Sequence, residues 1–61
     1  MMTRLEELEE KRRRVYRGLW AAEGLAAATS KQRIRDGFER IATEYRVMLE
    51  ELDRLLARRA A

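Results

Sequence analysis

The 61-residue sequence predicts an all-α protein, an antiparallel αα-hairpin, and three observations carry this prediction. Residues of high helix propensity, chiefly Ala, Leu, Glu and Arg, fill the chain, and proline is absent. Two long stretches carry apolar residues at alternating spacings of three and four, which places each set on one stripe of a helix. Between them lies the only polar stretch without this periodicity, residues 29–32. We therefore expect residues 1–61 to form one domain of two helices joined by a single turn.

The first helix is expected from about residue 3 to residue 28. Its stripe consists of Leu5, Leu8, Arg12, Val15, Leu19, Ala22 and Ala26. A charge in a helix seam costs stability unless it is paired. Arg12 is expected either to reach Glu44 or Glu51 in a four-helix bundle or to extend its head group into water. Gly18 and Gly24 each cost about 1 kcal/mol inside a helix relative to alanine, which favours close approach of another helix. The alternative is that the helix frays or ends early at Gly24.

The turn is expected at about residues 28–31, and the second helix from about residue 30 to residue 58. Thr29 followed by Gln32 fits the spacing of a capping box, and Ser30 is an equally suitable N-cap. The second stripe has no charged member and consists of Ile34, Phe38, Ile41, Tyr45, Met48, Leu52 and Leu55. If the chain folds back at Ser30, facing residues have numbers that sum to about 60, and each layer then pairs the two stripes.

A lone hairpin has no second layer to cover its apolar surface. Ordering about 60 residues costs roughly what one helix seam returns. Leu49 and Leu56 widen the second stripe sideways, which is typical of a bundle face. We therefore expect two hairpins to associate as a homodimeric four-helix bundle with twofold symmetry. The residues expected in this dimer seam are Leu5, Leu8, Arg12, Val15, Leu19, Ala22, Ile34, Phe38, Ile41, Tyr45, Met48, Leu49, Leu52, Leu55 and Leu56.

The charges of whole segments favour an antiparallel dimer. Residues 1–10 carry a net charge of −3, while Lys31, Arg33 and Arg35 make the turn end basic. An antiparallel arrangement places each acidic open end beside the basic turn end of the other chain. Exposed charges of this kind set orientation more than stability.

The basic residues concentrate in residues 11–17, which carry a net charge of +5 in a chain of net charge +3. Arg13, Arg14, Arg17 and Trp20 form a candidate face for nucleic acid or another partner, because guanidinium and indole groups both stack on bases. The alternative is a solvated surface, since glutamates precede three of the basic residues by four positions, the favourable order for helical ion pairs.

Composition argues against several classes of function. The chain contains no histidine and no cysteine, which removes the usual general base, thiol nucleophile and metal ligands. We therefore expect no catalytic residues, no cofactor and no metal site. No apolar run approaches the roughly 20 residues of a membrane span, and the acidic N-terminal region is unlike a signal peptide. A cytoplasmic location is the default expectation.

Two resemblances accompany this reading. The stretch from Tyr16 to Leu56 resembles a group of short alphaproteobacterial helical proteins. The matching features are Tyr16-Arg17, the Leu-Ala-rich run from Leu25 to Ser30, Arg33 and Arg35, the Ala42-Thr43-Glu44-Tyr45 step and the Leu-rich end from Leu49 to Leu56. Ser30-Lys31-Gln32 stands where that group has an Asp-Pro turn. The chain is also similar in size and architecture to the Rop-type RNA-binding hairpin. Both resemblances imply a helical hairpin and neither transfers a site.

The sequence thus predicts a non-enzymatic homodimeric hairpin that acts as an adaptor, small regulator or assembly subunit through protein–protein contacts. One alternative is an RNA- or DNA-binding four-helix dimer that uses the basic band and Trp20. Another is a subunit of a larger complex whose core is completed by a different protein.

Overall fold

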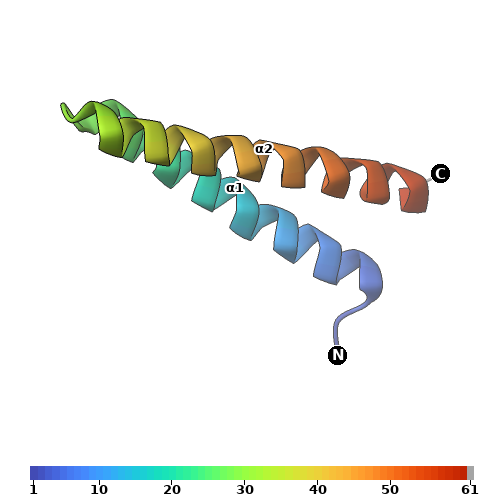
Figure 1. Ribbon diagram of the computed structural model, residues 1–61. Helices are drawn as coiled ribbons and strands as arrows, with labels where there is room; N and C mark the ends of the chain where they lie inside the picture. Colours follow the sequence, from blue (N-terminus) through green and yellow to red (C-terminus); the bar gives the residue numbers. More distant parts are fainter. Residues whose placement is uncertain (61) are drawn as a thin grey trace.

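The computed structural model describes residues 1–60 and shows two long helices packed side by side. Helix α1 spans Arg4–Ala28 and helix α2 spans Gln32–Ala60. The chain reverses between them, so that both termini lie at the same end, called here the open end (Figure 1). The molecule measures 44 × 21 × 11 Å, and its smallest dimension equals the thickness of one helix. The predicted αα-hairpin is confirmed, and it is a single layer.

Helix α1 begins with a capping box at Thr3 and Glu6, which was not predicted from the sequence. The Thr3 hydroxyl accepts a hydrogen bond from the Glu6 amide at 3.1 Å, and the Thr3 amide donates to the Glu6 carboxylate at 3.2 Å. Two amides of the first turn, which have no partner within the helix, are thereby satisfied.

The capping box predicted at Thr29 and Gln32 was wrong, and α2 begins at Gln32 rather than near residue 30. The Thr29 amide instead donates to the carbonyl of Leu25 at 3.2 Å and closes α1. The Thr29 hydroxyl accepts from the Lys31 amide at 3.2 Å, which stabilises the turn itself. The first helical bond of α2 runs from the Arg35 amide to the Lys31 carbonyl, so Lys31 occupies the cap position.

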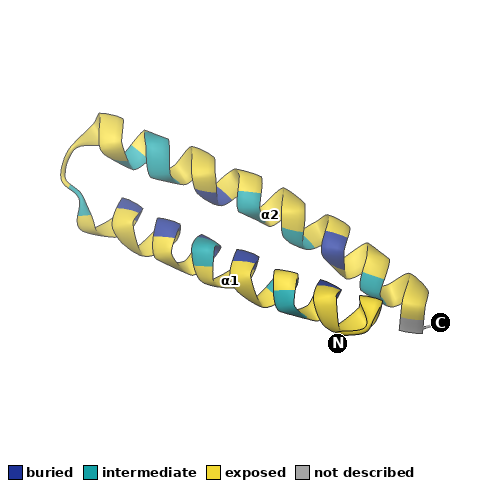
Figure 2. Ribbon diagram, turned by 90° about the horizontal axis from the view of Figure 1, so that it is seen from below, coloured by how far each residue is buried: buried dark blue, intermediate teal, exposed yellow. Residues whose placement is uncertain are grey.

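The core lies along the seam between the helices (Figure 2). On α1 the buried residues are Leu8, Val15, Leu19, Ala22 and Ala26. On α2 the buried or half-buried residues with matching periodicity are Arg35, Phe38, Ala42, Tyr45, Leu49, Leu52 and Leu56. Near the open end Leu8, Val15 and Leu52 form one buried cluster, and towards the turn Leu19 and Ala22 pack on Ala42. Leu5 was expected in the seam but is 42% exposed.

Helix α2 is rotated relative to the hairpin seam that the sequence predicted. Four residues of the predicted stripe, Ile34, Ile41, Met48 and Leu55, are 41–44% exposed. Leu49 and Leu56, expected to lie at its side, are inside the seam together with Ala42, which is 1% exposed. The small Ala22 and Ala42 side chains let the backbones approach closely, and this contact directs Ala42 rather than its larger neighbour towards α1.

Gly18 supports the same close approach. A Cβ atom built on Gly18 would lie 2.7 Å from Cζ of Tyr45, so the aromatic ring occupies the space that a side chain would need. The predicted close contact is confirmed at this position. At Gly24 the prediction was wrong, because a Cβ atom there would have no neighbour within 4 Å.

Candidate functional site

The most distinctive surface feature is an apolar row on α2 that the hairpin leaves uncovered. We call it the apolar stripe and define it as Ile34, Ile41, Met48 and Leu55. A spacing of seven residues is nearly two full helical turns, so the four side chains point the same way. The stripe runs along most of α2, and all four residues are exposed to a similar degree.

The corresponding surface of α1 changes character along its length. Tyr45 adjoins the stripe and covers Gly18, so the Gly18 side of α1 belongs to the same face of the hairpin. Towards the turn, residues on this side are small or apolar: Gly18, Ala21, Leu25 and Ala28. Towards the open end they are charged: Arg4, Glu7, Lys11 and Arg14. These four charged residues line a hollow of about 330 Å³ together with Leu55 of the stripe, which confirms that both rows share one face. We call this surface the open face.

A second hollow on the open face has the geometry of a helix-packing site. It has a volume of about 190 Å³ and is lined by Ile34, Gly37, Phe38 and Ile41. These positions are i, i+3, i+4 and i+7, the four residues that surround an inserted side chain in knobs-into-holes packing. A Cβ atom on Gly37 would have no neighbour within 4 Å, so the hollow is open at its centre.

The total exposed area shows that the hairpin has more surface than a compact monomer of its size. A compact 7.3 kDa protein exposes about 4,200 Å². The hairpin exposes 5126 Å². The difference, on the order of 900 Å², is close to the roughly 800 Å² that each partner buries in a standard protein–protein interface.

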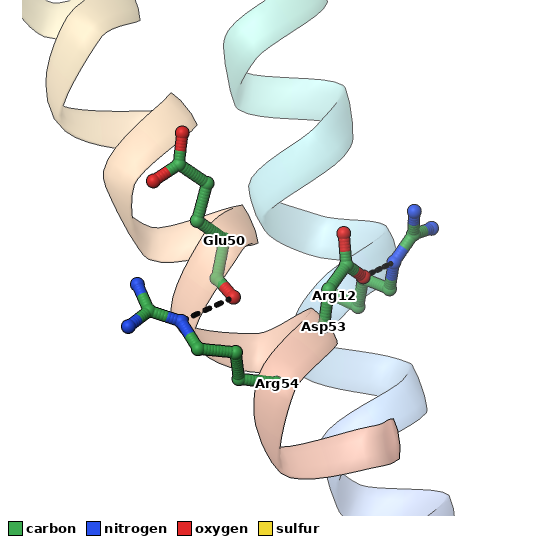
Figure 3. Close-up of polar contacts among 4 residues, drawn as sticks. All are labelled: Arg12, Glu50, Asp53 and Arg54. Carbon is green, nitrogen blue, oxygen red and sulfur yellow. Dashed lines mark hydrogen bonds and ion pairs between the residues drawn. The ribbon is translucent and has the colours of Figure 1, made fainter.

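On the opposite face of the hairpin, ion pairs connect α1 and α2. Arg12 Nε donates to Asp53 Oδ1 at 2.7 Å (Figure 3), and Arg46 lies 3.8 Å from Glu23. The hydrogen bond to Asp53, together with the attraction of the Asp53 charge, raises the pKa of Arg12 above its ordinary value. Within the hairpin Arg12 is therefore paired with Asp53, a partner that was not predicted from the sequence, whereas the pair with Glu44 or Glu51 was expected in a four-helix bundle.

The four residues of the predicted nucleic-acid face do not form one patch. Arg17 and Trp20 line a shared hollow with Tyr16, and Trp20 is 78% exposed. Arg13 forms an ion pair at 2.9 Å with a glutamate one turn earlier. Arg14 belongs to the open face, because consecutive helical residues point about 100° apart. Only Arg17 accompanies Trp20 closely.

Within residues 1–60, no cluster of three or more His, Cys, Asp or Glu side chains is arranged to hold a metal ion. Neither of the two described helices is long and apolar enough to cross a membrane. The chain matches no protein family, no curated protein and no solved structure.

Proposed function

We propose that this protein is a non-enzymatic homodimeric helical hairpin that acts as an adaptor, small regulator or assembly subunit through protein–protein contacts. The observation that carries the proposal is the apolar stripe, an aligned row of large side chains on a molecule only one helix thick. Soluble monomers seldom expose such continuous apolar surface unless it binds something.

The free energy gained by burying the apolar stripe is of the size that supports a reversible association. Fully burying one Ile, Leu or Met side chain is worth about 1.5–3 kcal/mol, and each stripe residue retains about two-fifths of its exposure. Eight such side chains in a dimer therefore contribute about 5–10 kcal/mol. Association costs about 4–15 kcal/mol, so the stripe needs the rest of the open face to form a stable dimer.

Sedimentation equilibrium combined with circular dichroism over one dilution series tests this proposal. The expected result is a helical dimer that loses helicity as it dissociates, because each hairpin lacks its second layer when alone. A monomer at all concentrations would refute the proposal. If that monomer is also poorly helical, the core is completed by a different protein, and capture of that protein becomes the next experiment.

A second candidate function, binding of RNA or DNA, is favoured by the exposure of Trp20 beside Arg17. An indole and a guanidinium that share one hollow form a small stacking platform for a base. Titration of the protein into labelled single-stranded RNA at increasing salt tests this candidate. Binding through phosphates weakens steeply with salt, and it should also be lost in Trp20→Ala.

A further inference from the structure

The open faces of two hairpins can meet in two symmetric ways, and the structure distinguishes between them. In a parallel dimer both turns lie at the same end, and α2 of each chain covers α1 of the other. In an antiparallel dimer the turns lie at opposite ends, and each helix covers its own copy. A closed twofold dimer of the parallel type permits no sliding along the helices, so its register follows from the hairpin alone.

The contacts within the hairpin give that register. Gly18 lies opposite Tyr45, and Ala22 packs with Ala42, so residues at the same height have numbers that sum to about 63. Leu25 is consequently at the height of the hollow around Gly37. In a parallel dimer the partner's Leu25 is at the same height and faces this hollow directly.

The half of the open face near the turn is complementary in size. On α2 it presents the large Ile34 and Ile41 around the open centre at Gly37. On α1 it presents Gly18, Ala21 and Ala28, which are small, and Leu25, which is exposed. A parallel dimer inserts Leu25 of each chain into the hollow of the other and lays the two isoleucines over the small residues. This is knobs-into-holes packing of a four-helix bundle.

The half near the open end is complementary in charge. Glu44 and Glu51 border the stripe on α2. Glu51 lies at the height of Lys11 and Arg14 on α1, and Glu44 lies about five residues nearer the turn than Arg14. Among the described residues, none of these four takes part in an ion pair within the hairpin, so all four can pair with a second copy. The same register places Arg58 near the partner's Glu7.

An antiparallel dimer would satisfy fewer of these features. It would pair the apolar stripe with its own copy, but it would lay Leu25 on the partner's Lys11 and leave the hollow at Gly37 without that side chain. It would also bring Glu44 of the two chains together. The net charges of whole sequence segments favoured the antiparallel orientation because they include residues on the outer surfaces of the hairpin. Only charges on the contacting face determine the orientation.

We propose that the open face binds the open face of a second copy in the parallel orientation, with Leu25 of each chain seated in the hollow formed by Ile34, Gly37, Phe38 and Ile41 of the other. This inference depends on the proposed homodimer. It adds the orientation, the register and the residues in contact.

Disulfide crosslinking between singly substituted chains tests the orientation. The chain contains no cysteine, so each variant carries only the introduced thiol and cannot crosslink internally. Chains carrying Leu25→Cys are mixed with mass-tagged chains carrying Gly37→Cys, and the mixture is equilibrated, oxidised and weighed by mass spectrometry. Ala28→Cys mixed with Ile34→Cys is a second pair at the same height. Disulfides require Cα atoms about 4.4–6.8 Å apart, so efficient linkage reports direct facing.

Two control mixtures make the outcome decisive. Ile41→Cys with Met48→Cys reports the antiparallel orientation, and Val47→Cys, on the outer surface of α2, reports random collision. The expected result is mixed crosslinking of the Leu25 and Gly37 variants, and of the Ala28 and Ile34 variants, well above the Val47 background. Crosslinking of only the Ile41 and Met48 variants, or of none in a sample that sediments as a dimer, would overturn this inference and leave the proposed function intact. A sample that sediments as a monomer would overturn both.

Discussion

Replacing Gly18 by alanine tests whether the Tyr45 ring occupies the position that the structure gives it. A glycine inside a helix costs about 1 kcal/mol relative to alanine, so Gly18→Ala gains about that amount from backbone propensity. The new methyl carbon would, however, lie 2.7 Å from Cζ of Tyr45, and the ring must move. Displacing a packed side chain costs about 1–3 kcal/mol. We expect a net loss in the free energy of unfolding of about 0–2 kcal/mol.

The matched control is Gly24→Ala in the same helix. A Cβ atom at Gly24 meets nothing within 4 Å, so only the propensity gain of about 1 kcal/mol applies. That gain raises the thermal midpoint of a domain this small by about 4–8 °C. The two glycine substitutions should therefore move the midpoint in opposite directions, or Gly18→Ala should at most leave it unchanged.

Thermal and urea unfolding followed by circular dichroism at one fixed protein concentration measures both variants, since association shifts apparent stability. A double-mutant cycle with Tyr45→Leu then isolates the contact. With the ring removed, Gly18→Ala should stabilise as much as Gly24→Ala. The reasoning fails if Gly18→Ala stabilises the wild-type protein as much as Gly24→Ala does, because the ring would then not lie over Gly18.

Three further substitutions test other parts of the structure. Ile41→Glu places a charge in the middle of the apolar stripe and should weaken self-association more than tenfold in sedimentation experiments. Val47 is slightly more exposed than Ile41 and lies on the outer surface of α2, so Val47→Glu should leave self-association unchanged. Equal effects of the two substitutions would show that the stripe is not the contact surface. Arg12→Leu removes the ion pair with Asp53 but places an apolar side chain at a seam position, so the thermal midpoint should stay the same or rise, and a large fall would contradict this. Thr3→Ala removes the capping box and should lower the free energy of unfolding by about 0.5–2 kcal/mol, as measured by urea titration, while an unchanged value would mean that the first turn frays in the native protein.

The periodicity of the sequence predicted the helices well because it depends on local propensity and on a repeat that both helices follow closely. Periodicity could not predict the rotation of α2, because the apolar residues of α2 fall in three adjacent seven-residue rows, which include Ile41, Tyr45 and Ala42 respectively. A seam with a single neighbouring helix covers only two of these rows. Ile41 and Ala42 are consecutive, and either one allows a seven-residue repeat. The larger side chain looked like the core residue, yet the smaller one is buried.

The polar contacts were predicted less well, for a related reason. Thr3 and Thr29 are both followed three residues later by a Glu or Gln, yet only Thr3 forms the box. The Thr29 backbone is already engaged in closing α1, so its hydroxyl serves the turn. Arg12 had several carboxylates within reach of a flexible side chain, and the rotation of α2 determined that Asp53 is its partner.

The sequence by itself determined that this protein is two helices and one turn, since propensity and periodicity are properties of neighbouring residues along the chain. Only the tertiary structure decided which side of α2 faces α1, and therefore which apolar residues remain for a second molecule. That choice follows from the space between the helices. Gly18, Ala22 and Ala42 permit a close approach that larger residues would prevent, and this approach leaves Ile34, Ile41, Met48 and Leu55 on the open face.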